Sequence, residues 1–199
     1  MPLELPSVIT PSRPDLRPGT VRVFFALWSS RDLAVCLAAV AGDFAGRFGG
    51  RPTRQETIHL TLAFLGEVAE ERLPELLRCA AELRLPSFAL EIDTLACWER
   101  QHLLWAGGSR ISEPLLRLVE TLRAALAKSG FAADAGRSGF TPHLSLVRRL
   151  PEAGMPSGEQ LQSLISPQHW SCQRFVLVRS HLSSAGPDYQ TIAEFPLVP

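Results

Sequence analysis

The sequence predicts a mixed α and β fold made of two related lobes that face each other. Segments that alternate apolar and polar residues, as strands do, are interleaved with segments whose apolar residues recur at helical spacing. The order strand, helix, strand also occurs twice. Each copy ends in a similar strand, which reads HLTL from residue 59 and HLSL from residue 143. We interpret this similarity as a diverged internal repeat.

The first half of the chain contains the first copy of this unit. Alternation and a high content of aromatic and β-branched residues predict strands over 21–28 and 58–65, the second of them closed by Gly66. Apolar residues every three or four positions predict helices over 31–47 and 70–83.

The second half of the chain repeats this order and adds two closing strands. Residues 150–157 are rich in Pro and Gly and predict a loop, and Ser166, Pro167 and Gln168 predict a turn before His169. The expected elements are strands over 88–98 and 102–106, a helix over 112–128, a strand over 140–147, a short helix over 158–165 and strands over 175–182 and 189–197.

The composition fits one globular domain over residues 21–199, since 46% of the 199 residues are hydrophobic. Residues 1–20 contain five prolines and are expected to form a poorly ordered N-terminal extension. No apolar run approaches the roughly 20 residues of a membrane-spanning helix. The four cysteines are scattered and form no C-x-x-C pair. This is typical of a reduced, cytoplasmic protein without a zinc site.

The charges of the chain are balanced, with 20 Lys and Arg against 20 Asp and Glu. A protein that binds long nucleic acid through many phosphates normally carries a net positive charge. Any contact with nucleic acid is therefore expected to be short and local. Lys128 is the only lysine. The remaining basic residues are arginines, whose planar group suits phosphate.

Each of the two repeated strands places a histidine and a hydroxyl on one face. Residues two apart in a strand point the same way, so His59 shares a face with Thr61 and His143 with Ser145. Two such strands across a groove supply two imidazoles and two hydroxyls. A histidine pKa of about 6.5 lets one ring accept a proton from water while the other protonates a leaving alkoxide. This set suits cleavage of a phosphodiester without a metal.

The surrounding sequence distinguishes these two histidines from the others. Four of the five histidines are followed two positions later by Ser or Thr, so the triplet alone is a weak signal. Only His59 and His143 lie in alternating strands with leucine at the first and third following positions. A lone strand histidine is more often structural, but the repeated context favours function here. Simple alternation also places Phe64 in the core with these leucines.

In this context the chain resembles the 2H phosphoesterase superfamily. Within it, the closest resemblance is to the bacterial RNA 2′,3′-cyclic phosphodiesterases, also called 2′-5′ RNA ligase-like proteins. The similarity covers residues 21–197. The matching stretches are RVFFAL from residue 22, IHLTLAFLGEV from 58, LW from 104, FTPHLSLVR from 140 and, after residue 179, S-x-L, G-x-x-Y and F-P-L.

The resemblance implies a bilobal α+β fold in which antiparallel sheets line a central groove. It also implies hydrolysis of RNA 2′,3′-cyclic phosphate ends to a 2′-phosphate without metal or cofactor, and an ability to join tRNA halves through a 2′-5′ bond. On this basis His59 and His143 are the expected catalytic residues, and Thr61, Ser145 and Arg148 the expected substrate-binding residues.

The chain departs from the family pattern at two points. Ser145 stands where close relatives usually have threonine, so the methyl group that restricts χ1 is missing. Arg148 follows His143 by five residues, and simple alternation places it on the opposite face of the strand. It reaches the groove only if the strand bends or ends near Val147. Arg149 is the alternative phosphate-binding arginine, because it follows His143 by six residues and strict alternation places it on the same face.

The roles of the two histidines are not ordered by the sequence. Our working assignment makes His143 the base toward water and His59 the acid toward the leaving O3′.

Phe24, Trp105 and Tyr189 are candidates to stack on a nucleobase, as aromatic residues do in many RNA-binding proteins. Core packing is the simpler interpretation of each.

Two other functions are compatible with these residues. One is a cyclic phosphodiesterase that acts on a small nucleotide, and the other is a non-catalytic RNA-binding module. The histidines and the neutral charge argue against the module. The expected partners are therefore RNA 3′ ends with a 2′,3′-cyclic phosphate or a small cyclic nucleotide, with no membrane contact, and the chain is expected to be a monomer.

Overall fold

The computed structural model describes residue 17 and residues 19–133, 139–151, 158–183 and 186–199. Most of the Pro-rich segment, and residues 152–157 of the expected loop, lie outside these ranges. Thr20 already belongs to the first strand, one residue before its expected start.

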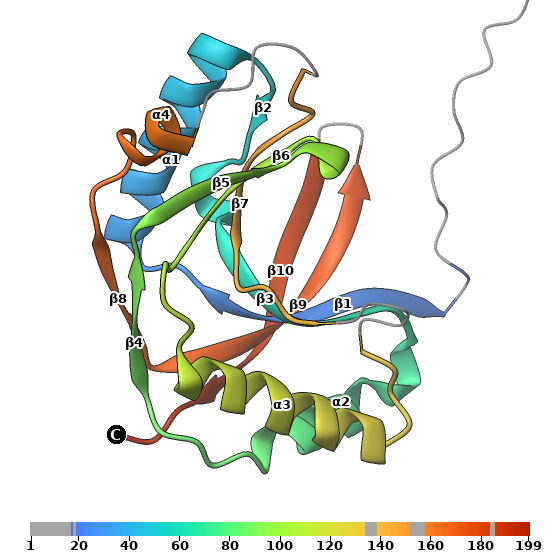
Figure 1. Ribbon diagram of the computed structural model, residues 1–199. Coiled ribbons are helices and arrows are strands. Elements are labelled where there is room, and N and C mark those ends of the chain that lie inside the picture. Colours follow the sequence, from blue (N-terminus) through green and yellow to red (C-terminus); the bar gives the residue numbers. More distant parts are fainter. Residues whose placement is uncertain (1–16, 18, 134–138, 152–157, 184–185) are drawn as a thin grey trace, which may run out of the picture.

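Most strands form one antiparallel sheet with two halves (Figure 1). Its members are β1 (Thr20–Trp28), β2 (Arg51–Pro52), β3 (His59–Ala69), β5 (Thr94–Trp98), β6 (Leu103–Gly107), β7 (Leu144–Arg148), β9 (Arg174–Ser183) and β10 (Gly186–Pro196). Their order is β10-β9-β1-β3-β7-β6-β5, and β2 also pairs with β7. The two halves meet between β3 and β7, where Leu60 pairs with Leu144. The antiparallel α+β fold expected from the sequence is confirmed.

The described residues form four α-helices: α1 (Arg31–Phe48), α2 (Leu73–Ala81), α3 (Glu113–Lys128) and α4 (Gly158–Gln162). The long helices cross between the halves. Helix α1 follows β1 in the chain but packs against β7 and β2, and α3 precedes β7 but packs against β3. Helices α2 and α3 lie together at one end of the molecule (Figure 1). None of the helices in the described part of the chain is long and apolar enough to span a membrane.

The apolar residues form two clusters on opposite sides of the first half of the sheet. The larger cluster is the main core between the sheet and the helices, and it contains alternate residues of β1, among them Phe25 and Leu27. We call the smaller one the groove-side cluster. It consists of Phe24, Ala26, Val176 and Val178, with Trp28, Phe64 and Tyr189 packed against them.

Phe64 was expected in the main core, and this prediction is wrong. Phe25 pairs with Ala63 and Ala26 pairs with Thr61, so Leu62 is an extra residue in β3. A bulge of this kind inverts the alternation beyond it. Phe64 therefore lies on the same side of the sheet as Thr61, in the groove-side cluster.

Gly66 was expected to close this strand, and this prediction is wrong, because β3 continues to Ala69. Its φ of 71° places it in the left-handed region that favours glycine. The register between β1 and β3 shifts at this position, between Val23 and Phe24. Gly66 thus permits an irregularity within the strand.

The expected long strand over 88–98 is two strands in different sheets. Strand β4 (Phe88–Ile92) pairs with β8 (Gln168–Cys172) in a separate ribbon, and β5 belongs to the main sheet. The chain is interrupted at Asp93, whose carboxylate accepts a hydrogen bond from the backbone N–H of Ser109 at 2.6 Å.

Two further expectations are corrected. The turn predicted before His169 is absent, because β8 already begins at Gln168. The strand expected over 140–147 begins only at Leu144. Pro142 has no backbone N–H to donate to a neighbouring strand, so His143 lies just before β7.

We predict that Leu60→Ala destabilises the protein by about 2–5 kcal/mol, because Leu60 is 1% exposed and removing its side chain leaves a cavity where the two halves meet. Urea unfolding measures the change. Val35→Ala is the control, since Val35 is 49% exposed and should change stability by less than about 0.5 kcal/mol. An equally small effect of Leu60→Ala would contradict the prediction.

Candidate active site

The backbone holds His59 and His143 in the same way. Nδ1 of His59 lies 2.7 Å from the carbonyl oxygen of Thr57, and Nδ1 of His143 lies 2.9 Å from that of Thr141. A carbonyl oxygen only accepts, so Nδ1 donates in both rings and Nε2 carries the lone pair when the ring is neutral. The shared pattern T-x-H-L-[TS]-L contains both threonines whose carbonyl oxygens accept these hydrogen bonds, a signal that was not among the sequence predictions.

The pairing of Leu60 with Leu144 brings the two motifs together. Because the strands are antiparallel, the residue before Leu60 lies beside the residue after Leu144, so His59 is adjacent to Ser145. In the same way Thr61 is adjacent to His143. Both leucines are buried, and alternation turns their neighbours to the other face, where they form one polar site.

Aromatic rings surround His59. The ring of Trp28 stacks on it with centroids 5.1 Å apart and planes 8° from parallel. Tyr189 meets it edge-on at 5.3 Å, and the ring of Phe24 lies at 5.0 Å. Phe24 and Tyr189 thus border the site as well as packing in the groove-side cluster.

Trp98 occupies the equivalent position beside His143, with centroids 4.6 Å apart, and Trp105 lies at 6.4 Å. Each imidazole therefore contacts a tryptophan from the end of another strand. Trp28 comes from β1, which pairs with β3, and Trp98 comes from β5, which β6 separates from β7. Neither tryptophan was expected at the site from the sequence. No sequence signal marks them, because the contact depends on strand pairing.

Burial lowers the pKa of His59 from its ordinary value of 6.5 to about 4, despite the backbone hydrogen bond to Thr57, which raises it. The positive charges of Arg148 and His143 lower this pKa further. The unliganded protein therefore carries a neutral imidazole at position 59 at pH 7.

Arg148 shares the face of Ser145. Its Nη2 donates to the Ser145 hydroxyl oxygen at 3.0 Å. Strand β7 ends at Arg148, and Arg149 has a φ of 57°, so the strand's alternation no longer restricts either side chain. Both arginines border the same cavity, so both positions stay candidates for binding an anion there.

The cavity at this site has a volume of about 270 Å³. His59, Ser145, Arg148 and Tyr189 line it, whereas Thr61 and His143 lie next to it and are not part of its lining. The described residues that line it include four arginines and no carboxylate. This arrangement can bind a small anionic group beside two imidazoles.

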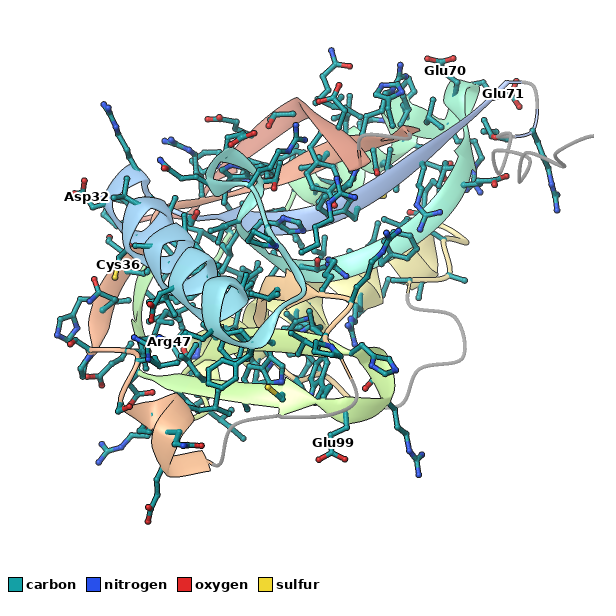
Figure 2. All side chains as sticks on the ribbon, turned by 90° about the horizontal axis from the view of Figure 1, so that it is seen from above. Asp32, Cys36, Arg47, Glu70, Glu71 and Glu99 are labelled. Atoms are coloured by element: carbon teal, nitrogen blue, oxygen red, sulfur yellow. The ribbon has the colours of Figure 1, made fainter. Side chains whose placement is uncertain are left out.

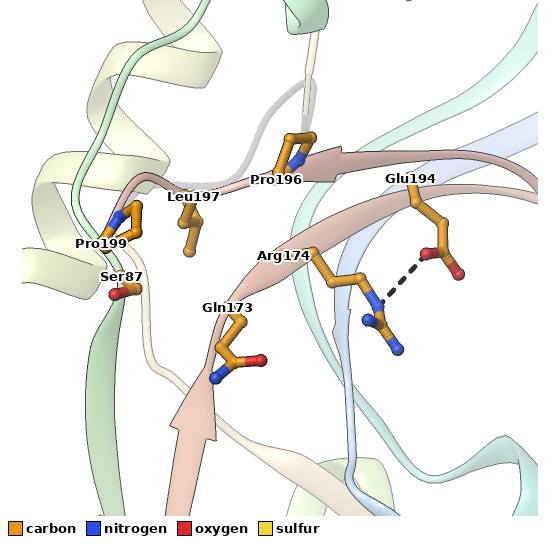
Figure 3. A pocket seen from close by; sticks show the side chains of 7 residues that line it. All are labelled: Ser87, Gln173, Arg174, Glu194, Pro196, Leu197 and Pro199. Carbon is orange, nitrogen blue, oxygen red and sulfur yellow. Dashed lines mark ion pairs between the residues drawn. The ribbon is translucent and has the colours of Figure 1, made fainter.

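A larger hollow of about 620 Å³ lies between the start of β9, the end of β10 and the start of β4 (Figure 3). Its arginine, Arg174, lies 3.3 Å from Glu194, so the two charges compensate each other. None of the described residues that line it is a histidine or cysteine. It offers no acid–base pair and is not the candidate active site.

The described residues contain no group of three or more His, Cys, Asp or Glu side chains that could hold a metal ion. The four cysteines are free thiols. Burial raises the pKa of Cys172 to about 12, so this thiol is not a nucleophile near neutral pH.

Comparison with known proteins shows what this chain is similar to. A family model described as LigT like phosphoesterase matches residues 29–105. The RNA 2′,3′-cyclic phosphodiesterase of Escherichia coli is 38% identical over 104 residues, which cover 52% of this chain and 58% of the relative. That of Thermus thermophilus is 28% identical over 186 residues, which cover 89% of this chain and 90% of the relative.

Solved structures agree over nearly the whole length. Escherichia coli LigT in complex with 3′-AMP has a TM-score of 0.78 and 28% identity, and the match covers 90% of this chain and 99% of LigT. The chain is therefore similar to LigT-like phosphoesterases in sequence and in fold. The family model ends before His143. The second half of the 2H site therefore rests on its geometry and on the whole-chain similarity.

We predict that the stability of this protein falls as the pH is lowered from 7 to 4. In that range the unfolded chain protonates His59 at about 6.5, whereas the folded protein does so only at about 4. The unfolded state binds more protons, and the loss is on the order of 2–3 kcal/mol. Urea unfolding across this pH range measures it.

His59→Gln removes the titrating group and should flatten this pH dependence, whereas the control His181→Gln, at an exposed position, should keep it. Equal slopes for His59→Gln and the wild type would show that His59 is not desolvated in the folded protein.

Proposed function

We propose that this protein hydrolyses the 2′,3′-cyclic phosphate at RNA 3′ ends to a 2′-phosphate without a metal, using His59 and His143 as its acid–base pair. The observation that carries the proposal is the matched pair of imidazoles beside the Leu60–Leu144 pairing, each with Nδ1–H bound to a carbonyl and each next to a hydroxyl. The names of the curated relatives support the choice of substrate.

In the proposed reaction a water molecule attacks phosphorus and transfers a proton to Nε2 of His143. The bond between phosphorus and O3′ breaks, and Nε2–H of His59 protonates the departing oxygen. The product is a 2′-phosphate and a 3′-hydroxyl, and proton exchange with solvent restores both rings. If the 5′-hydroxyl of a second RNA replaces water, the same steps form the 2′-5′ bond expected of the family.

Arg148, Ser145 and Thr61 bind the phosphate in this proposal. The hydrogen bond to Ser145 fixes the guanidinium of Arg148 at the cavity, where its remaining N–H groups can donate to the non-bridging oxygens. Donors oriented in advance toward developing negative charge lower the barrier to phosphoryl transfer. Ser145 retains the hydroxyl that this role requires, so its difference from threonine preserves the chemistry.

The low pKa of His59 is compatible with its role as the acid. The unliganded ring is neutral because it is buried and lies near the positive charge of Arg148. A bound cyclic phosphate brings a negative charge next to the ring. A nearby negative charge favours the protonated imidazole and so raises the pKa of His59. The substrate therefore promotes the protonation that His59 needs.

A small cyclic nucleotide remains the second candidate substrate. The observation that favours it is the solved complex of the relative LigT with 3′-AMP, a mononucleotide. A panel of nucleoside 2′,3′-cyclic phosphates and of oligonucleotides with the same end separates the two substrates. For compartment and assembly, we propose a monomer in the cytoplasm, where the four free cysteines would stay reduced.

We predict turnover of an RNA oligonucleotide that ends in a 2′,3′-cyclic phosphate, in excess EDTA, with the 2′-phosphate as product. His59→Ala and His143→Ala should each lower kcat/KM by at least about 100-fold, the usual contribution of a general acid or base. His181→Ala is the matched control. Near-normal activity of either catalytic variant would contradict the two-histidine mechanism, and activity only with added metal would contradict metal independence.

We predict that a substrate with sulfur in place of O3′ distinguishes the two histidines. A thiolate leaves without protonation, so His59→Ala should lose much less activity on this substrate than on the oxygen substrate. His143→Ala should lose at least about 100-fold on both, because the attacking water still needs a base. The opposite pattern of rescue would exchange the two roles.

A further inference from the structure

Three arginines beyond Arg148 border the active-site cavity: Arg51, Arg54 and Arg149. Arg51 in β2 is the direct cross-strand partner of Arg148 in β7. Like charges opposite each other in a sheet destabilise it. The fold thus places two guanidinium groups together at an energetic cost, as expected where an anion binds between them.

Contacts with the first two residues of β10 hold two of these side chains at the cavity. A Cβ at Gly186 would lie 2.7 Å from Nη2 of Arg51, so the guanidinium fits against the start of β10 because residue 186 is glycine. Nη2 of Arg54 donates to the carbonyl oxygen of Pro187 at 2.7 Å. Arg51 and Arg54 therefore reach from one side of the cavity to the other.

Arg54 and Arg149 provide two further indications of binding. Arg54 also lies 3.4 Å from Glu56, but both side chains are more than half exposed, so this ion pair is weak and leaves N–H donors for a ligand. Arg149 has a φ of 57°, a left-handed conformation that is unfavourable for a residue with a Cβ. Strained residues of this kind occur mainly at binding and catalytic sites.

The charge around the cavity is one-sided although the protein as a whole is neutral. The described residues that line the cavity include no carboxylate. The acidic side chains labelled in Figure 2, Asp32, Glu70, Glu71 and Glu99, lie at the periphery of the molecule. One phosphate bound to Arg148 and Ser145 would balance only part of the positive charge of the four arginines that line the cavity.

We propose that Arg51, Arg54 and Arg149 form a second phosphate subsite that binds the internucleotide phosphodiester one residue before the cyclic phosphate. This inference rests on the proposed function and extends it from the reacting group to the RNA chain. The enzyme then selects RNA ends over mononucleotides through a single additional phosphate. Such a short contact agrees with the overall charge of +0.

The test compares kcat/KM for three substrates: adenosine 2′,3′-cyclic phosphate, its 5′-phosphorylated form, and the dinucleotide ApA with the same cyclic end. The wild type should prefer the second and third over the first by about 10-fold or more, the usual effect of a charge-assisted hydrogen bond. Arg149→Gly and Arg54→Gln should each lower this preference several-fold. Arg149→Gly also relieves the backbone strain, so misfolding would not explain its effect.

Arg174→Gln is the matched control, since Arg174 is also ion-paired and exposed but lies at the other hollow. It should keep the wild-type preference. Equal kcat/KM for all three substrates would overturn the subsite. A gain for the dinucleotide alone would mean that its extra nucleoside is bound, and a gain for the 5′-phosphorylated mononucleotide alone would mean a terminal phosphate. Either result would also overturn the assignment.

Failure of this inference is distinguishable from failure of the proposed function. Turnover of the mononucleotide without any preference would contradict only the subsite. If none of the three substrates is cleaved, the proposed function fails. In that case, titration of the protein with adenosine 2′-phosphate and with ApA 2′-phosphate tests the subsite alone: tighter binding of the dinucleotide that is lost in Arg149→Gly would support it, and equal binding would overturn it.

Discussion

The antiparallel contact between β3 and β7 at Leu60 and Leu144 determines the geometry of the whole site. Because the two leucines are buried opposite each other, each histidine lies next to the hydroxyl of the other motif. A shift of one residue in this register would turn the histidines toward the core. The approximate two-fold relation of the site thus follows from a single strand pairing.

The exchange of helices between the halves of the sheet protects this contact. Helix α1 comes from the first half of the chain and packs on β7, and α3 comes from the second and packs on β3. Helix packing thus links the two halves of the sheet, and the described residues share a continuous core. This arrangement differs from two self-contained lobes joined by a groove, and it makes the spacing of the two histidines a property of the whole core.

The electrostatics of the site depend on the same packing. Aromatic rings desolvate His59, and Arg148 adds a positive charge nearby, so the unliganded site carries a neutral imidazole in a cavity bordered by guanidinium groups. An anionic substrate changes this balance in the direction that catalysis requires. Binding of the phosphate and protonation of the acid are therefore coupled in the proposed mechanism.

The sequence by itself determined the α+β class, most strands and helices, and the two motifs that carry the histidines, because alternation and helical spacing are local patterns. Only the tertiary structure decided the features that depend on strand pairing. The bulge at Leu62 moved Phe64 to the groove side, and Asp93 divided one expected strand between two sheets. Because β7 ends at Arg148, the alternation of the strand does not fix the direction of this side chain. Trp28, Trp98 and Arg51 lie at the site because strands far apart in the chain pair there. Register and contacts between distant segments have no local signature, since they result from the packing of the complete chain.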